Sequence, residues 1–519
     1  MGRWSFSYLI LCLTLLGCAP TAPPGTPVVQ KAAAPTTPAV AGPAQPVARA
    51  APDREIWTTI YMLDRKVGYS HQAIGKVKEN GEELIHTQSD SELTILREKD
   101  SLTQQLHLQS WETPAGDVRR FESRMTSGKD EIIAQGTISE RGLVLTTNTL
   151  GKKVTKLIPW PEKCGGYFAV DQSLEKKPLK AGESRTVVGL LPIFNQPAEA
   201  QLTALEEEEV SLRGLKQKLL KIKNEIKIGK DTLTTFCWID EQGKMLKSFD
   251  PTFKQETFLT TKEFALKKED LGPIDLLAET TAKLKGELPV ERPLKHAVYL
   301  AKLKDGQKID GQFATDEFQQ FTAIDDLSGK LKITLLDRSS PVDEKLRGSK
   351  PVAEDSAPNS LIQSDDPEVI RLAASIAPNE TEPFAMAVAL EKGVRQHIHK
   401  RGYAQAFATA AEVVRSHEGD CTEHAVLLAA VCRSRRIPAR VVLGLVHYPP
   451  QQGFAYHMWN EVWISERWVP LDATVAQGAV GADHIKLRHA NLHGESAYAV
   501  MLPLLAVVGR LELEVVESK

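Results

Sequence analysis

The strongest constraint on the fold lies in residues 416–474, where a cysteine at a helix start precedes a histidine and an aspartate on strands. Gly419 interrupts the preceding structure, and Asp420 followed three residues later by Glu423 has the pattern of a capping box. Cys421 is therefore predicted to be the first helical residue, where the positive end of the helix dipole favours a thiolate. The two acidic neighbours oppose that effect, so a further cation is needed, and a histidine is its usual source.

A β-hairpin is predicted after this helix. Residues 455–464 alternate in a period of two, which indicates a strand with His457 on the same face as Trp459. After a short turn, residues 468–471 form the return strand and bring Asp472 close to His457. Trp459 is a candidate wall of a substrate pocket, although tryptophans on such a strand more often pack in the core.

The order Cys421, His457, Asp472, with separations of 36 residues (457 − 421) and 15 residues (472 − 457), predicts a papain-type site. A nucleophile on a helix, a base on a strand and a carboxylate that orients the base are the parts such a site needs. The backbone N–H of Cys421 is the candidate oxyanion donor. Asp420, Glu423 and His424 are expected to surround the cysteine.

Cys421 has two alternative roles. A cysteine is commonly a small buried apolar residue, but the capping residues and the later histidine and aspartate favour a nucleophile. His417, Cys421 and His424 also have a spacing that a zinc ion could use. Zinc would quench the nucleophile and no second Cys/His pair lies at ligand spacing, so neither a metal nor another cofactor is expected.

Four motifs resemble the transglutaminase-like superfamily of cysteine enzymes. They are G-D-C-T-E-H-A at 419–425, I-P-A-R-V-V at 437–442, H-M-W-N-E-V-W at 457–463 and W-V-P-L-D-A-T at 468–474, and the resemblance covers roughly the last 150 residues. It implies Cys421 as nucleophile, His457 as general base and acid, and Asp472 as the orienting carboxylate. The family contains acyl-transferring cross-linkers, peptidases, amidases and members without catalysis, so it does not name the reaction.

The chain of 519 residues is long enough for several domains, and its net charge of −3 gives no support for nucleic-acid binding. The fold class predicted is multidomain, with mostly antiparallel β domains followed by an α+β papain-like or transglutaminase-like domain. The expected order is a signal peptide at 1–18, a Pro/Ala-rich tether at 19–53, a large β domain at 54–272, a small β spacer domain at 273–357 and the catalytic domain at 358–519.

The first eighteen residues resemble a bacterial lipoprotein signal. Arg3 precedes the apolar run 8–16, and Leu15-Leu16-Gly17-Cys18 has the form of a lipobox. The resemblance implies that Cys18 is lipidated and becomes the mature N-terminus, with Ala19 typical of sorting to the outer membrane. A plain secretory signal or an uncleaved anchor is the alternative. The expected location is the periplasmic face of the outer membrane.

The β-rich region at 54–272 predicts a large curved antiparallel sheet or half-barrel, which looks like exported domains that hold lipids or partners. Its lysine-rich run 216–230 is interpreted as a solvated strand face, with docking to an anionic envelope polymer as the alternative. Cys164 and Cys237 either pair in a disulfide or are separate buried thiols, and Cys432 is expected in the core. The remaining C-terminal histidines were assigned to the surface or to helix caps: His397, His399, His447, His484, His489 and His493.

The predicted reaction is attack on a carboxamide or peptide bond through an acyl-thioester, with hydrolysis favoured slightly over acyl transfer. The expected partners are a protein or peptide substrate and a membrane reached through the lipid anchor; the oligomeric state is left open. Two other classes remain: a catalytically silent module that binds peptides or envelope components, and a carrier of lipid or envelope material built on the N-terminal sheet.

Overall fold

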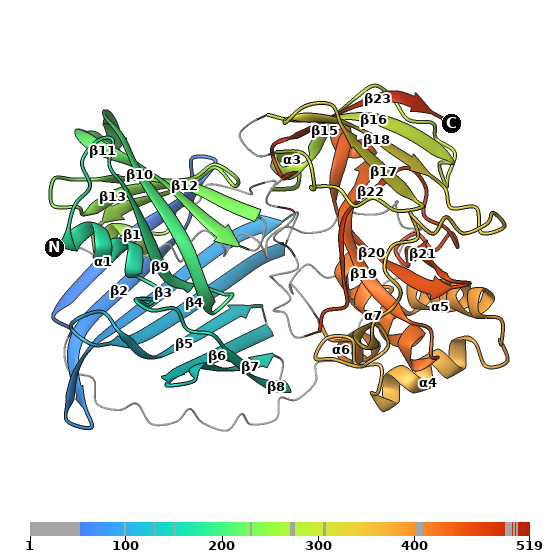
Figure 1. Cartoon of the computed structure of the whole chain (residues 1–519), viewed down its shortest axis with the longest axis horizontal. Coiled ribbons are helices and arrows are strands. Elements are labelled where there is room, and N and C mark those ends of the chain that lie inside the picture. Colours follow the sequence, from blue (N-terminus) through green and yellow to red (C-terminus); the bar gives the residue numbers. More distant parts are fainter. Residues whose placement is uncertain are drawn as a thin grey trace.

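The computed structural model describes residues 52–97, 100–128, 130–149, 152–228, 231–269, 274, 276–304, 308–400, 408–493, 501, 504 and 507–519. The expected signal peptide and the tether up to residue 51 lie outside the described residues. The described structure is mostly β, with one large sheet in the N-terminal half and a second sheet with four covering helices in the C-terminal half (Figure 1).

Among the described residues, fourteen strands form the N-terminal sheet in the order β8-β7-β6-β5-β4-β3-β2-β1-β14-β13-β12-β11-β10-β9. The strands are β1 (Arg54–Met62), β2 (Arg65–Glu79), β3 (Glu82–Arg97), β4 (Asp100–Glu112), β5 (Val118–Ser127), β6 (Asp130–Ser139), β7 (Gly142–Thr149), β8 (Lys152–Ile158), β9 (Ser184–Leu191), β10 (Gln196–Leu212), β11 (Leu215–Ile228), β12 (Asp231–Ile239), β13 (Met245–Asp250) and β14 (Gln255–Thr260). All their pairings are antiparallel, which confirms the large antiparallel sheet.

Period-two alternation gives this sheet its two faces. In β5, Phe121, Ser123 and Met125 are buried, whereas Arg124 between the last two is exposed. The sheet curves so that its two halves face each other: Ile56 of β1 packs in one cluster with Ile222 of β11. Figure 1 shows β9 to β13 in green across β2 to β8 in blue and teal, with helix α1 (Ala169–Lys176) at one end.

The inner face of β1 to β4 is polar along one stripe. Cross-strand neighbours on it include Thr58 and Ser70, Ser70 and Ser91, Gln72 and Ser89. All five side chains are buried, and Ser89 Oγ and both polar atoms of Gln72 have no hydrogen-bond partner within the described chain. Because buried polar groups lose free energy unless they are hydrated or paired, this stripe suits water or a polar ligand better than an acyl chain. The lipid-carrier alternative is therefore not favoured.

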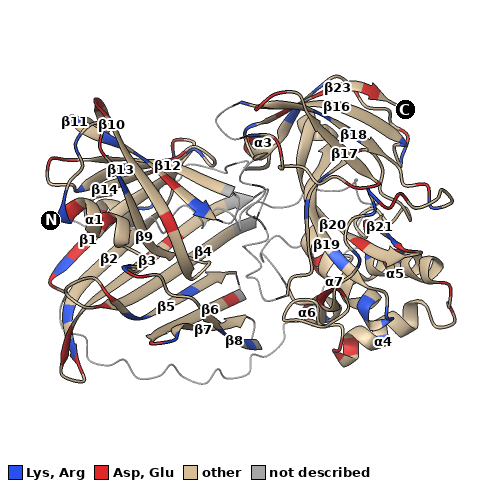
Figure 2. Cartoon of the chain, in the orientation of Figure 1, with Lys and Arg blue, Asp and Glu red and all other residues tan. Residues whose placement is uncertain are grey.

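Acidic and basic residues lie side by side along β10 and β11 (Figure 2). Lys216 pairs with Glu209 at 2.7 Å and Lys218 with Glu207 at 2.8 Å, and all four side chains are exposed. The lysine-rich run is thus a solvated face that the neighbouring acidic run neutralises, which agrees with the solvated interpretation rather than with docking to a polyanion.

Nine strands form the second sheet in the described chain, in the order β17-β18-β16-β23-β15-β20-β19-β22, and β21 pairs with the same edge of β20 as β15, farther along that strand. They are β15 (Ala282–Lys285), β16 (His296–Leu303), β17 (Gln319–Ala323), β18 (Ser328–Thr334), β19 (Ala439–Tyr448), β20 (Gly453–Ile464), β21 (Arg467–Leu471), β22 (His484–Ala490) and β23 (Leu511–Ser518).

This sheet joins two regions that the sequence predicted as separate domains. Strands β15 to β18 come from the expected spacer at 273–357, and they are continuous with the strands of the expected catalytic domain through β23 and β20. Helix α3 (Leu276–Thr280) is short, and Ala282 begins β15. The spacer is therefore part of the same sheet, because strand pairing over more than 150 residues leaves no local sequence pattern.

Helices cover one side of this sheet around α7 (Cys421–Ser434), which packs on β19 and β20. The others are α4 (Pro367–Ile376), α5 (Pro383–His397) and α6 (Ala410–Ser416); shorter helices are α2 (Lys262–Leu266), η3 (Ala353–Asp355) and η4 (Pro449–Gln451). Asp366 caps α4, because its side chain accepts the N–H groups of Glu368 and Val369. Glu382 caps α5, because its carboxylate accepts the N–H groups of the first turn after Pro383.

Cys164, Cys237 and Cys432 are buried free thiols, so the disulfide alternative for Cys164 and Cys237 is wrong. Burial raises the pKa of the Cys164 thiol to about 12. Within the described residues, no helix has both the length and the apolar character needed to cross a membrane.

Candidate active site

The cysteine sits where the capping residues predicted. Helix α7 begins at Cys421; the Asp420 carboxylate accepts the N–H of Thr422 at 2.9 Å, and Glu423 accepts the N–H of Asp420 at 2.9 Å. This confirms the capping box. Cys421 is 3% exposed, and its Sγ accepts the backbone N–H of Met458 at 3.3 Å. The sulfur therefore lies against β20 at the residue next to His457.

Glu423 is one of the two acidic residues that flank Cys421 and oppose a thiolate there. Its side chain is buried, and its second oxygen accepts the N–H of Ala408 at 3.0 Å. Burial, with the Asp420 carboxylate as the next cause, raises the pKa of Glu423 well above its usual value. This rise favours the neutral form of Glu423, which opposes a thiolate at Cys421 less than the charged form would.

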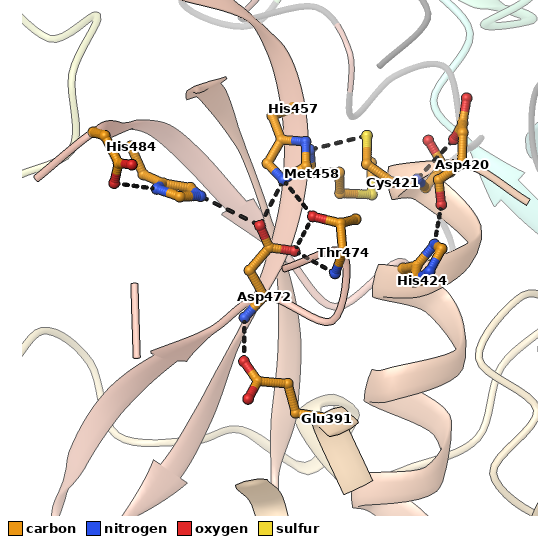
Figure 3. Close-up of polar contacts among 11 residues, drawn as sticks. Glu391, Asp420, Cys421, His424, His457, Met458, Asp472, Thr474 and His484 are labelled. Carbon is orange, nitrogen blue, oxygen red and sulfur yellow. Dashed lines mark hydrogen bonds and ion pairs between the residues drawn. The ribbon is translucent and has the colours of Figure 1, made fainter. Parts of the chain in front are cut away.

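His457 is fully buried on β20, and its Nε2 lies 2.8 Å from Asp472 Oδ2. Strand β21 pairs antiparallel with β20, Leu471 opposite Asn460, which confirms the predicted hairpin and brings Asp472 to the histidine. Since a carboxylate only accepts, Nε2 carries the proton and donates it to Asp472. The buried Nδ1 has no hydrogen-bond partner among the described residues, and Figure 3 shows His457 beside Cys421. In the neutral ring Nδ1 would then hold the lone pair that a base requires.

Asp472 is held from several sides. Its Oδ1 accepts the N–H and the hydroxyl of Thr474 at 2.8 and 2.7 Å, and its own N–H donates to Glu391 Oε1 at 2.9 Å (Figure 3). Burial opposes ionisation, but the charges and hydrogen bonds of His457 and His484 hold the pKa of Asp472 well below its usual value. The carboxylate is therefore ionised and fixed in orientation.

His484 is the residue that sequence reasoning placed wrongly. It was expected at the surface or at a cap, but it is 4% exposed at the start of β22. Its Nε2 lies 3.3 Å from Asp472 Oδ2 and its Nδ1 lies 3.0 Å from Asp483 Oδ1. The pairing of β22 with β19 turns the side chain inward. Only the adjacent Asp483-His484 pair in the sequence hinted at a charged contact, and no spacing linked it to Asp472.

The remaining predicted residues lie nearby. His424 occupies the first turn of α7 and its Nδ1 donates to the Asp420 carbonyl at 2.6 Å; burial lowers its pKa. Trp459 is 1% exposed and packs between the two histidines, stacked on His457 with ring centroids 6.1 Å apart and edge-on to His484 at 5.3 Å. Its ring therefore forms a buried support of the site rather than an exposed pocket wall.

A metal could be considered at one place in the described chain, where ligand atoms of His457, Asp472 and His484 lie within 4.8 Å of one another. Hydrogen bonds account for this cluster, because both imidazoles contact the same carboxylate oxygen. The zinc alternative named His417, but its Nδ1 contacts the His397 carbonyl and its ring packs on that of His397.

Residues 370–473 match the transglutaminase-like superfamily. This range includes all of α7 and β20 and closes one residue after Asp472. The C-terminal half thus carries a transglutaminase-like domain. No curated protein matches the chain.

Similar solved structures share little sequence with this chain. A proposed cysteine protease from Cytophaga hutchinsonii is 12% identical over 44% of this chain and 89% of its own, with a TM-score of 0.29. The periplasmic domain of TgpA from Pseudomonas aeruginosa is 16% identical over 36% and 91%, with a TM-score of 0.23. A β-barrel-like protein of a domain of unknown function from Brucella abortus is 10% identical over 40% and 95%, with a TM-score of 0.30. Likeness at this level says nothing about the reaction.

Proposed function

We propose that this protein is a cysteine enzyme of the transglutaminase-like kind that acts on amide or peptide bonds, with Cys421 as nucleophile, His457 as general base and acid, and Asp472 as the group that orients His457. One observation carries the proposal. The His457 Nε2 contact to Asp472 Oδ2 at 2.8 Å leaves Nδ1 without a partner in the described chain, and His457 lies beside Cys421 (Figure 3). That is the tautomer which can accept a thiol proton.

The first half-reaction forms a thioester. The Cys421 proton moves to His457 Nδ1, and the sulfur bonds to the carbonyl carbon, whose oxygen takes up the electron pair. The backbone N–H of Cys421 at the start of α7 is the candidate donor to this oxyanion. When the tetrahedral species collapses, the C–N bond breaks and the imidazolium gives its proton to the leaving amine or ammonia.

In the second half-reaction, His457 takes a proton from water or from a primary amine, which attacks the thioester and releases the thiolate. Water gives hydrolysis and an amine gives acyl transfer. We favour hydrolysis, because an enzyme tethered to an envelope membrane meets water far more often than a positioned amine. Protein or peptide is the substrate class that this chemistry implies.

We also propose that the protein is exported and held by a lipid on Cys18 at the periplasmic face of the outer membrane. The lipobox and the Pro/Ala-rich segment behind it support this address. The test is expression of the wild type and of Cys18→Ser, followed by membrane fractionation and intact-mass measurement. Loss of both the lipid mass and the membrane association in the variant is the expected result; an unchanged mass in both proteins would refute lipidation.

A silent binding module is the second candidate, and the burial of the site favours it. Cys421, His457 and Asp472 are 3%, 0% and 1% exposed, so a substrate reaches them only after the surroundings move. In this reading the fold recognises a peptide or an envelope component and the three side chains are remnants.

Alkylation separates the two readings. The reduced protein is treated with iodoacetamide over a range of pH, and modification of each cysteine is read by mass spectrometry in the wild type and in His457→Ala. Cys432, fully buried in the same helix, is the internal control, since burial raises its pKa. We expect Cys421 to react with a midpoint well below the unperturbed value of about 8.5 and to lose this advantage in the variant. If Cys421 behaves like Cys432 in both proteins, the catalytic proposal fails.

A further inference from the structure

His484 lies between two carboxylates, with a ring nitrogen 3.3 Å from Asp472 Oδ2 and the other 3.0 Å from Asp483 Oδ1. A carboxylate offers only acceptors, and a neutral imidazole has a single N–H. A neutral His484 would therefore turn a lone pair toward one of the two negatively charged oxygens. Both contacts are satisfied only when both nitrogens carry protons.

We propose that His484 is a positioning residue that stays protonated, shares the Asp472 carboxylate with His457, and so holds His457 as a neutral imidazole ready to accept the Cys421 proton. This inference rests on the proposed function. No motif of the transglutaminase-like match contains His484, which lies beyond its last residue at 473.

The charges around this chain of contacts support the assignment. Asp483 Oδ2 also pairs with Arg292 Nε at 2.7 Å, so Arg292 and His484 together balance Asp472 and Asp483 while His457 is neutral. With a neutral His484 the same buried group would carry one uncompensated negative charge, which is costly in the interior. Burial lowers the pKa of His484, but Asp483 and Asp472 outweigh it and raise the pKa to about 9.

Other ionisable groups face these residues from the neighbouring elements. They are Cys421 and His424 of α7, Glu391 of α5, Tyr299 of β16 and His447 of β19. Burial raises the pKa of Glu391 to about 7 and lowers the pKa of His424, so both are largely or partly uncharged near neutral pH. None of them replaces the positive charge of His484 next to Asp472.

Distance sets the size of the effect. The rings of His457 and His484 have centroids 5.7 Å apart. Two positive charges at that distance in the interior would repel each other, so a protonated His484 disfavours a second positive charge on His457.

The test compares the full-length wild type with His484→Gln by NMR of ¹³C-labelled histidine rings. The His457 and His484 signals are identified by their loss in His457→Gln and His484→Gln. Glutamine can still donate to Asp472, but it carries no charge. We expect the wild-type His484 signal to remain in its charged position up to pH 8, and the wild-type His457 signal at pH 7 to have the position of a neutral ring that is protonated at Nε2. In His484→Gln the His457 signal at the same pH should move toward the position of a charged ring. His489→Gln, exposed on the same strand, should change neither signal.

A wild-type His484 that titrates near the ordinary value of about 6.5, or a His457 signal that stays in the neutral position in His484→Gln, would overturn the proposal. A second variant, Asp483→Asn, tests the proposal if His484→Gln does not fold. It leaves both histidines in place and removes one of the carboxylates on His484, so the His484 pKa should fall. If these titrations behave as expected while no amide is cleaved or transferred, the proposed function fails and the charge assignment of His484 stands.

Discussion

The Glu391 side chain accepts the backbone N–H of Asp472 at 2.9 Å, and its other oxygen accepts the N–H of Gly478 at 2.8 Å. Glu391 is on α5, 81 residues before Asp472, and is fully buried. The Glu391 side chain thus holds the loop that carries the orienting carboxylate at two points, at Asp472 and at Gly478. Nothing in the sequence pattern of α5 singled it out, because a glutamate in a helix is ordinarily a surface residue.

Glu391 makes stability depend on pH. Burial, partly offset by the two N–H donors, raises its pKa from 4.5 to about 7. The folded state therefore binds a proton more tightly than the unfolded state, so this residue's contribution to stability falls as pH rises from about 4.5 to about 7. The whole change is on the order of 3 kcal/mol. In Glu391→Gln we expect this component to be absent, with the variant relatively weakest at pH 5. Urea unfolding of both proteins at pH 5 and 8 checks it; a constant difference between them would contradict it.

Asp472→Asn should impair the site without unfolding it. An amide N–H facing His457 Nε2 would force the proton onto Nδ1 and remove the base. We expect the rate of Cys421 acylation or alkylation near neutral pH to fall by about 10² to 10⁴. The exposed Asp310→Asn is the matched control and should react like the wild type. Equal rates in wild type and Asp472→Asn would remove Asp472 from the proposed mechanism.

Lys486 joins the two regions of the second sheet through buried ion pairs. Its Nζ contacts Asp316 at 2.7 Å and also Glu461, which in turn pairs with Arg440 at 2.7 Å. In Lys486→Ala, Glu461 loses one of its two cations and Asp316 its buried partner, so we expect a loss of about 3 to 5 kcal/mol of unfolding free energy. Chemical unfolding followed by tryptophan fluorescence measures it. Lys283→Ala, on the exposed side of β15, should stay within about 0.5 kcal/mol.

Gly444 leaves room for Trp459. A Cβ at this position of β19 would lie 2.0 Å from the Ile485 carbonyl oxygen and 2.5 Å from the Trp459 ring. Moving the backbone away from such a contact costs free energy. Gly444→Ala is therefore expected to destabilise the fold by about 1 to 3 kcal/mol and to shift the tryptophan emission. Gly75→Ala is the control, because the atom nearest to a Cβ at this position is 3.7 Å away. The unfolding midpoint of this variant should match that of the wild type. A Gly444→Ala protein as stable as the wild type would show that β19 and β22 separate easily.

Part of this site could be predicted from the sequence because it depends on interactions between residues close together in the chain. The capping box at Asp420 and Glu423, the start of α7 at Cys421 and the hairpin from His457 to Asp472 all lie within a few residues of the signals that predict them. Capping and period-two alternation act between near neighbours, so the sequence displays them directly. The large antiparallel sheet was readable for the same reason.

No such local signal exists for three other features of the structure. His484 lies 12 residues and Glu391 lies 81 residues from Asp472 along the chain. Strand β15, which joins β15 to β18 to the catalytic strands, lies more than 100 residues from β20. The charges of the side chains likewise depend on the folded structure. The sequence places two acidic residues beside Cys421, but burial raises the pKa of Glu423. The carboxylates around His484 keep its imidazole charged. Burial and contact set these charges, and both are properties of the folded chain alone.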